Sequence, residues 1–130
     1  MPKLRRRFPF IPEHRKLQEI LADKELATLG DAYVNFLYSL YLSVKTRKPT
    51  GEKADSRILS DALRRSGLRD EVASRADRHK QADAAEALLV HAWLKETMTI
   101  MECLEILLEH ENPVEAFSNL LSRASKTLES

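Results

Sequence analysis

The segment that most constrains the fold is residues 26–43, LATLGDAYVNFLYSLYLS, an apolar run with one carboxylate near its middle. At 100° per residue its apolar side chains share one stripe, made of Leu26, Leu29, Gly30, Tyr33, Leu37, Leu40 and Tyr41. The pattern predicts a long helix that is buried on most sides. Asp31 lies outside the stripe, on a second face with Lys24, Ala27, Asn35 and Tyr38. Because an unpaired charge is costly to bury, we expect Asp31 to cap a helix, pair with a base or bind a metal ion.

A second apolar segment, residues 81–94, carries two further acids among alanines and leucines. Asp83 and Glu86 are three residues apart, which places both carboxylates on one helix face. Together with Asp31 they offer the hard oxygen ligands that Mg²⁺ and Mn²⁺ prefer. A divalent ion held in this way can activate water and stabilise charge on a phosphodiester. The alternative is structural, with Asp31 capping a helix that starts after Gly30 and with Asp83 and Glu86 exposed.

The composition predicts an all-α protein. The 130 residues include only three glycines and are rich in helix-forming residues. The single cysteine, Cys103, excludes an internal disulfide framework and a cysteine-rich zinc site. We expect residues 1–12, with three prolines and a basic cluster, to form an extended arm. Residues 13–130 are expected to form a single helical domain.

Capping and breaking residues predict where the helices begin and end. The predicted starts are Pro12, Asp55 or Ser56, Thr99 with Glu102, and Asn112 with Pro113. The predicted ends are the segments 47–51 and 66–67, which contain proline or glycine. Residues 70–79 are expected to form a short helix before the segment that carries Asp83.

Charge is distributed unevenly along the chain, although the net charge is only +1. Residues 45–80 contain eleven Lys and Arg against six Asp and Glu, whereas residues 81–130 contain three against nine. Such segregation is typical of a phosphate-binding surface, and equally of a set of solvated helix faces. No apolar run approaches the roughly 20 residues of a membrane span, and the basic start has no apolar core behind it. We therefore expect a cytoplasmic protein without a membrane partner.

Three blocks of the sequence resemble the ribonuclease III family. TLGDAYVNFLYSLYL resembles its signature helix, E-x-x-E-F-L-G-D-A/S, and ADAAEALLVHAWL resembles its second block, A-D-x-x-E-A-L-I-G-A-I-Y-L. Between them, TGEKADSRILSDALRRSGL is similar to the family's basic linker and the helix that ends in L-G-L. The likeness covers about residues 17–108, with the blocks in matching order and separation.

The resemblance implies an α-helical endonuclease domain, a bundle built around the buried signature helix. Such domains dimerise through that helix and cut double-stranded RNA with divalent metal ions. By position, Asp31, Asp83 and Glu86 correspond to family acids, which implies that all three bind Mg²⁺ or Mn²⁺. The same match implies catalytic roles for Asp31 and Glu86.

The chain departs from the family pattern at three positions. The family's metal-binding glutamate four residues before Asp31 is Ala27, and the glutamate three residues earlier is Lys24. The glycine of E-A-L-I-G is Val90. Ala27 leaves a gap that water can fill, whereas Lys24 can pair with Asp31 and keep it from a metal. The chain looks most like a short member, of the mini-ribonuclease III or archaeal type, without a double-stranded RNA-binding domain.

We therefore predict an endoribonuclease that hydrolyses phosphodiester bonds in double-stranded or structured RNA during RNA processing. A homodimer is expected because Val34, Phe36 and Tyr38 flank the main stripe and need burial. Six basic residues are expected to bind RNA: Arg5, Arg6, Arg7, Lys53, Arg57 and Lys80.

Two alternatives remain open. The first is a catalytically silent dimer of the same fold that acts as an RNA-binding module. The second reads residues 56–75 as a helix-turn-helix that places a basic helix in a DNA groove. His14, His91 and His110 share no ligand spacing and are read as ordinary surface or core histidines.

Overall fold

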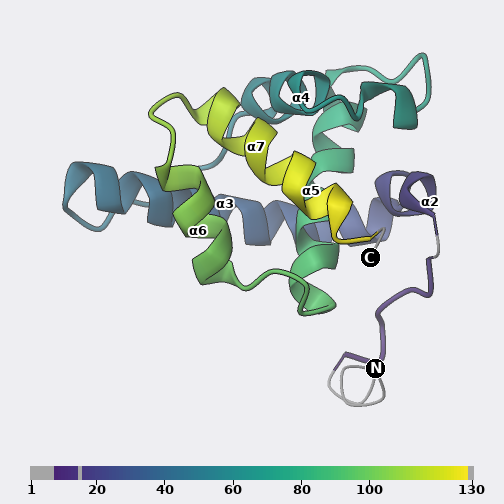
Figure 1. The fold of residues 1–130 in the computed structure, drawn as a ribbon, viewed down its shortest axis with the longest axis horizontal. Helices are drawn as coiled ribbons and strands as arrows, with labels where there is room; N and C mark the ends of the chain where they lie inside the picture. Colours follow the sequence, from purple (N-terminus) through teal and green to yellow (C-terminus); the bar gives the residue numbers. More distant parts are fainter. Residues whose placement is uncertain (1–7, 15, 129–130) are drawn as a thin grey trace.

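The computed structural model describes residues 8–14 and 16–128 of the chain. Its elements, in order, are α2 (Leu17–Leu21), α3 (Lys24–Thr46), α4 (Ser56–Arg65), the 3₁₀ turn η1 (Arg69–Glu71), α5 (Arg78–Leu94), α6 (Ile100–Leu108) and α7 (Pro113–Lys126) (Figure 1). This part of the chain has six α-helices and no strand, so the predicted all-α fold is confirmed.

The helix starts follow the capping residues in most places. Asp55 caps α4, Thr99 and Glu102 form the predicted capping box of α6, and Asn112 caps α7 ahead of Pro113. The helix α3 begins earlier than its apolar stripe, because the Asp23 carboxylate accepts a hydrogen bond of 2.9 Å from the Leu26 amide. Asp31 therefore lies within α3, and its reading as a helix cap is wrong.

Two predicted helices differ from the structure. Pro12 starts no helix, and α2 begins only at Leu17. Residues 70–79 form no helix of their own, because η1 ends at Glu71 and α5 starts at Arg78. The Arg69 guanidinium bonds the carbonyl oxygens of residues 73 and 74 at 3.1 and 2.9 Å, which holds this connection as a loop. Residues 56–75 thus contain one α-helix and a 3₁₀ turn, and the helix-turn-helix reading is wrong.

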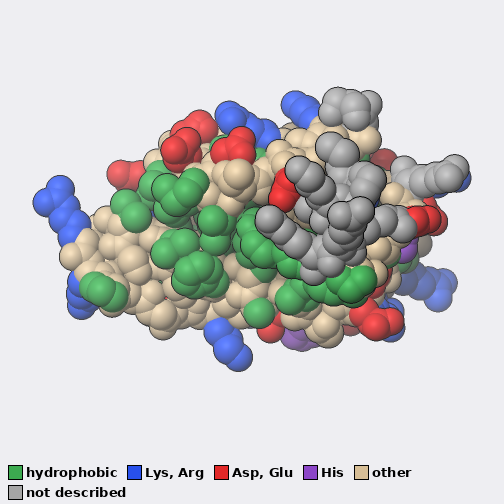
Figure 2. Space-filling model, turned by 90° about the horizontal axis from the view of Figure 1, so that it is seen from below, with side chains coloured by type: hydrophobic (Ala, Val, Ile, Leu, Met, Phe, Trp, Pro, Cys, Tyr) green, Lys and Arg blue, Asp and Glu red, His purple; other side chains and the backbone are tan. Residues whose placement is uncertain are grey.

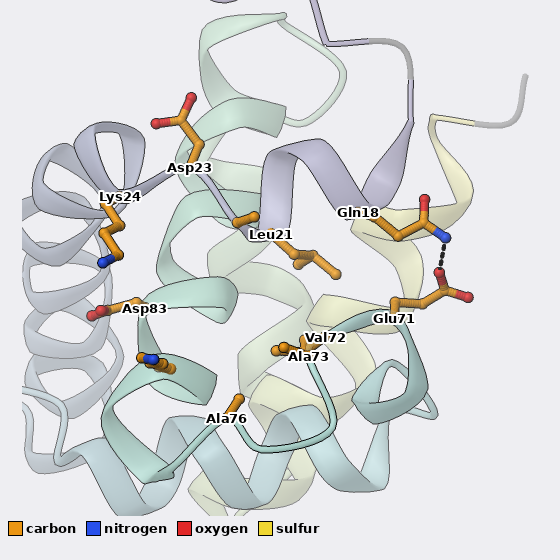
Figure 3. Close-up of a pocket in the computed structure, with 11 residues that line it drawn as sticks. Gln18, Leu21, Asp23, Lys24, Glu71, Val72, Ala73, Ala76 and Asp83 are labelled. Atoms are coloured by element: carbon orange, nitrogen blue, oxygen red, sulfur yellow. Dashed lines mark hydrogen bonds between the residues drawn. The ribbon is translucent and has the colours of Figure 1, made fainter.

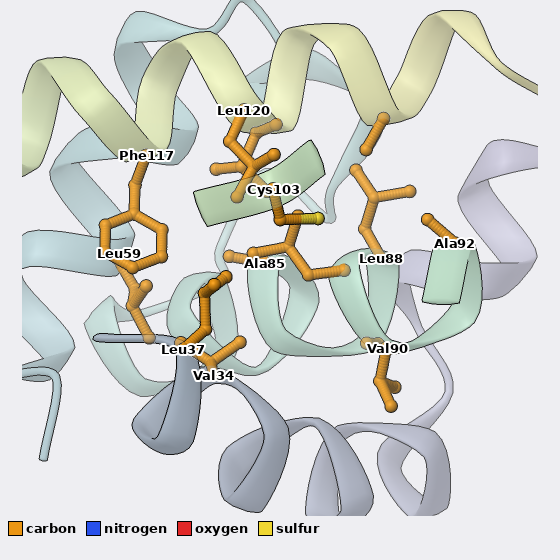
Figure 4. Close-up of a cluster of buried hydrophobic side chains, with 14 of the residues drawn as sticks. Val34, Leu37, Leu59, Ala85, Leu88, Val90, Ala92, Cys103, Phe117 and Leu120 are labelled. Atoms are coloured by element: carbon orange, nitrogen blue, oxygen red, sulfur yellow. The ribbon is translucent and has the colours of Figure 1, made fainter. Parts of the chain in front are cut away.

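The helix that is enclosed on nearly all sides is α5, whereas α3 is buried along one face. α2, α3, α4 and α7 all pack against α5, most extensively α3. Small side chains at Ala84, Ala85 and Ala87 allow these helices to approach it closely. Figure 4 shows α5 between α7 and α3, with Val90 directed toward α3. Val90 is fully buried there, so the α3–α5 interface accommodates its bulk.

The other side of α3 leaves large apolar side chains exposed. They are Leu29, Phe36 and Val44 on α3, with Met101 and Leu108 on α6. Figure 2 shows hydrophobic side chains gathered on the face along which α3 and α6 lie. Val34 and Tyr38, which were expected to need a partner, are buried within the chain, whereas Phe36 is 58% exposed. We call the five exposed residues the α3–α6 apolar face.

Candidate active site

The site is built where α3 crosses α5, with Gly30 against Glu86. A Cβ atom at Gly30 would overlap the Glu86 carbonyl oxygen and come within 3.0 Å of the Glu86 Cβ. The absence of a side chain at Gly30 therefore permits this crossing, since backbone atoms of α5 cannot move aside without unpacking the helix. The crossing places Asp31, the next residue of α3, beside the Glu86 carboxyl group.

Asp31 and Glu86 are the two acids that the structure brings into contact. Glu86 is only 6% exposed, and its pKa is raised to about 8. Burial is the main cause, followed by a hydrogen bond between its carboxyl group and Asp31 and by the negative charges of Asp31 and Asp83. Asp31 is itself exposed. The expected contact across the two helices is present, but the buried member is Glu86 and not Asp31.

Asp83 lies one turn before Glu86 and faces the same cavity. Burial raises the pKa of Asp83, and the charges of Asp31 and Asp77 add to this shift, whereas His79 and Lys24 oppose it. The negative charges of Asp83 and Glu86 are therefore disfavoured at this site. A cation entering the cavity would relieve this repulsion.

Lys24 lies near Asp83 and contributes to its electrostatics. The ion pairs formed by the described residues do not include one between Lys24 and Asp31. Figure 3 shows its ammonium group turned toward the Asp83 carboxylate. The Lys24–Asp31 pair, which was the alternative to metal binding by Asp31, is therefore not formed. The lysine is directed to the other end of the acidic group, because Lys24 starts α3 and lies two turns before Asp31.

Asn35 is a further residue of the site, beyond those predicted from the sequence. Its amide nitrogen donates a hydrogen bond of 3.2 Å to Asp31 Oδ1, and its amide oxygen accepts one of 2.8 Å from the Ala54 backbone. Asn35 thereby ties the Asp31 carboxylate to the segment that leads into α4. Its spacing of four residues from Asp31 on the same helix face was the available signal.

The acids open into a cavity of about 470 Å³ between α3, α4 and α5. Ala27 and Thr28 line it from α3, Ser56 and Leu59 from α4, and His79 from α5. Because Ala27 is one of the lining residues, a longer side chain at position 27 would extend toward the cavity. The predicted gap beside Asp31 is therefore present.

The cavity offers oxygen donors of the kind that hard divalent cations prefer. Asp31 and Glu86 supply adjacent carboxylates, and Asp83 lines the same wall. Within residues 8–14 and 16–128, no three His, Cys, Asp or Glu side chains are gathered closely enough to form a complete metal-binding group. Binding of one ion by all three acids remains a prediction, whereas the Asp31–Glu86 pair is a feature of the fold.

The expected RNA-binding residues lie in different places. Lys53 and Arg57 are exposed and flank Ala54 and Ser56, which line the cavity. Lys80 is exposed in the first turn of α5. Arg5, Arg6 and Arg7 lie outside the described residues.

Comparisons with known proteins identify the family. None of the helices in the described part of the chain is both long and apolar enough to cross a membrane. A comparison with curated proteins gives no match. The family model described as Ribonuclease III matches residues 24–129, which include α3 to α7 and all three acids. The chain therefore belongs to the ribonuclease III family.

Proposed function

We propose that this protein is a metal-dependent endoribonuclease that hydrolyses phosphodiester bonds in double-stranded or structured RNA. Membership of the ribonuclease III family indicates a role in RNA cleavage. The observation that carries the proposal is the contact of Asp31 with the buried Glu86 carboxyl group at the wall of an open cavity. Holding the Asp31 and Glu86 carboxyl groups together costs folding stability. Acids with strongly raised pKa values in a cavity are typical of functional sites.

Asp31, Glu86 and Asp83, which line the cavity together, would hold Mg²⁺ or Mn²⁺. Such an ion supplies an activated water molecule and stabilises charge on the phosphodiester. Asn35 keeps the Asp31 carboxylate directed into the cavity through its bonds to Asp31 and Ala54. Because Ala27 contributes no carboxylate, we expect weaker metal binding than in members that carry a glutamate there.

RNA would be recognised through its backbone and shape. Lys53 and Arg57, next in sequence to the cavity-lining Ala54 and Ser56, and Lys80 on α5 would supply the positive charge. Contacts with phosphates release counterions, so affinity should fall steeply with salt. Base sequence within a duplex would matter little, because the grooves of A-form RNA expose few readable base edges to side chains.

The α3–α6 apolar face is the expected interface of a homodimer. Its five large apolar side chains lie on two neighbouring helices and are exposed in a single chain. In a two-fold dimer such a face meets its own copy, which buries both at once.

The proposal is tested by incubating the purified protein with a defined RNA duplex over a range of Mg²⁺ and Mn²⁺ concentrations. We expect cleavage by the wild type and none by Glu86→Ala, because the buried carboxylate is lost. Asp31→Asn should also be inactive, since the amide keeps the shape and loses the charge. Glu105→Ala, at an exposed position of α6, is the matched control and should cleave normally. Wild-type protein that leaves the duplex uncut under all these conditions contradicts the proposal.

A silent RNA-binding module is the second candidate. Two departures from the family pattern favour it. The family has a glutamate at position 24, whereas the Lys24 ammonium group here faces Asp83. The family glutamate at position 27 is replaced by alanine, which has no carboxylate. In this case duplex RNA would bind with a steep salt dependence and remain uncut. Binding without metal-dependent cleavage, measured on the same preparation, distinguishes the two functions.

A further inference from the structure

A second cavity adjoins the candidate active site on the other side of Lys24 and Asp83. It has a volume of about 310 Å³ and lies between α2, η1 and the start of α5. Lys24 and Asp83 line both cavities, so the two are neighbours that share one wall. We call this second cavity the α2–α5 trough.

The trough is apolar along its floor and polar at both ends. Leu21 of α2 and Val72, Ala73 and Ala76 of the loop after η1 form the floor (Figure 3). One end is lined by two lysines and two acids, Lys24, Lys80, Asp23 and Asp83. At the other end the Gln18 amide nitrogen donates a hydrogen bond to the Glu71 carboxylate.

This arrangement matches the chemistry of a single nucleotide. A nucleobase has two apolar faces, which suit the aliphatic floor, and polar edges with amino and imino donors. The Glu71 carboxylate is an acceptor for such donors at the far end. The phosphate, joined to the base through the ribose, would place its negative charge toward Lys24 and Lys80, at the end that Asp23 and Asp83 also line. The volume is near the lower limit of the roughly 300–1,000 Å³ of small-ligand sites, which suits one base and not a duplex.

We propose that the α2–α5 trough binds one unpaired nucleotide of the RNA, next to the phosphodiester that faces Asp31 and Glu86. The inference rests on the proposed function and narrows its substrate class. A base within a continuous duplex is stacked and paired, and it cannot enter the trough without being extruded. RNA with a bulged or unpaired nucleotide beside the cleavage position offers that base without this cost. Such structured RNA would be preferred to a perfect duplex.

Direct binding to the wild-type protein is tested with adenosine and cytidine 5′-monophosphates as probes, followed by NMR of the backbone amides without added metal. We expect saturable shifts at residues 72–76 and in the first turn of α5. Ala73→Phe fills the trough and should abolish these shifts. Ser74→Phe adds the same side chain at the next position, which does not line the trough, and should leave them intact. Lys80→Gln should lower the affinity for the monophosphates by roughly tenfold, as expected for one lost charge-assisted hydrogen bond. The affinity for the unphosphorylated nucleosides should not change.

The substrate preference is tested by comparing a perfect duplex with the same duplex carrying one bulged nucleotide. We expect tighter binding and faster cleavage of the bulged RNA by the wild type and by Ser74→Phe. Ala73→Phe should lose this preference and treat both RNAs as the wild type treats the perfect duplex. A protein that cuts neither RNA but binds the monophosphates in the trough refutes the nuclease proposal and supports the trough.

The inference is overturned if the monophosphates cause no shifts, or if their shifts persist in Ala73→Phe. It is also overturned if the wild type cuts both RNAs equally well. If Ala73→Phe changes the oligomeric mass and leaves nucleotide binding intact, the trough is a protein interface and the inference is again refuted.

Discussion

The backbone of Gly30 in α3 lies directly against the backbone of Glu86 in α5, with no room for a Cβ atom between them. This contact sets the distance between the two helices and, at the same time, the position of the Asp31 carboxylate beside Glu86. The packing of the core and the arrangement of the acids therefore depend on the same crossing. A change that separates the helices should affect both stability and the site.

Gly30→Ala is expected to destabilise the protein by roughly 1–3 kcal/mol, the usual range for added bulk in a packed core. The added methyl group must displace backbone atoms of α5, which outweighs the gain in helix propensity. Gly51→Ala is the control, because a Cβ atom at Gly51 has open space around it. Denaturant unfolding of both variants measures the difference. Equal stabilities for Gly30→Ala and the wild type would show that α3 and α5 are farther apart than described.

Glu86→Gln is expected to change how stability depends on pH. The folded pKa of Glu86 is about 8, above the ordinary value of 4.5, so ionisation is disfavoured in the folded state. The wild type should therefore lose stability as the pH rises from about 4.5 through 8. In Glu86→Gln this loss should be largely removed, with a smaller share remaining from Asp83, whose pKa is also raised. Melting temperatures measured between pH 5 and 9 test this prediction, with Glu105→Gln as the exposed control. Parallel curves of melting temperature against pH for Glu86→Gln and the wild type would contradict it.

The sequence led to the correct pair of helices but not to the burial of their acids. The order of the blocks in the ribonuclease III pattern places Asp31 opposite Glu86, and this contact is present in the fold. The apolar character of α3 suggested that Asp31 would be buried. α3 is apolar on two faces, and the sequence alone does not say which of them the other helices cover.

Side-chain direction was harder to predict than helix placement. A helical wheel places Lys24 near Asp31, yet the flexible lysine extends toward Asp83 on α5. Residues 70–79 were predicted to form a short helix, but η1 ends at Glu71 and α5 starts only at Arg78. Arg69 instead bonds carbonyl groups of this loop, an interaction between residues four and five apart that periodicity does not reveal. Tertiary contacts decided both cases.

Ala27→Glu is expected to strengthen binding of Mn²⁺ and Mg²⁺, by roughly 10- to 100-fold if the added carboxylate becomes a ligand. The Ala27 methyl group lines the cavity beside Asp31 and Glu86, so the longer side chain enters the site. Isothermal titration with Mn²⁺ measures the affinity. Ser74→Glu adds the same charge at an exposed position outside the cavity and should not change the affinity. If the affinity of Ala27→Glu for Mn²⁺ equals that of the wild type, the metal ion does not bind in this cavity.

Phe36→Arg is expected to convert the proposed dimer to a monomer. Phe36 is 58% exposed on the α3–α6 apolar face, and a charge there would be buried without a partner in a two-fold interface. Phe36→Leu keeps the face apolar and should remain dimeric. Sedimentation equilibrium at micromolar concentration separates the two masses. A monomeric wild type under these conditions would refute the dimer.

His91→Leu is expected to stabilise the protein, most strongly at acid pH. His91 lies on α5 and is 1% exposed, and neither ring nitrogen has a hydrogen-bond partner among the described residues. Burial is the main cause that lowers the pKa of His91 to about 4; the charges of Lys95 and His14 lower it further, whereas that of Asp23 opposes the shift. An unsatisfied buried polar group costs about 1–3 kcal/mol, and leucine fills a similar volume without that cost.

The pH dependence of His91→Leu follows from the lowered pKa. In the wild type the contribution of His91 is intact above pH 6.5, its ordinary pKa, and is lost as the pH falls toward 4. The stability difference between His91→Leu and wild type should therefore widen over this interval. His110→Leu is the matched control, because it removes a histidine whose ring nitrogen lies 3.2 Å from the Asn119 amide nitrogen, and it should destabilise the protein. Urea unfolding at pH 7.5, 6.0 and 5.0 measures both variants. A His91→Leu variant that is less stable than wild type at every pH would mean that the imidazole ring has a partner that its surroundings in α5 do not reveal.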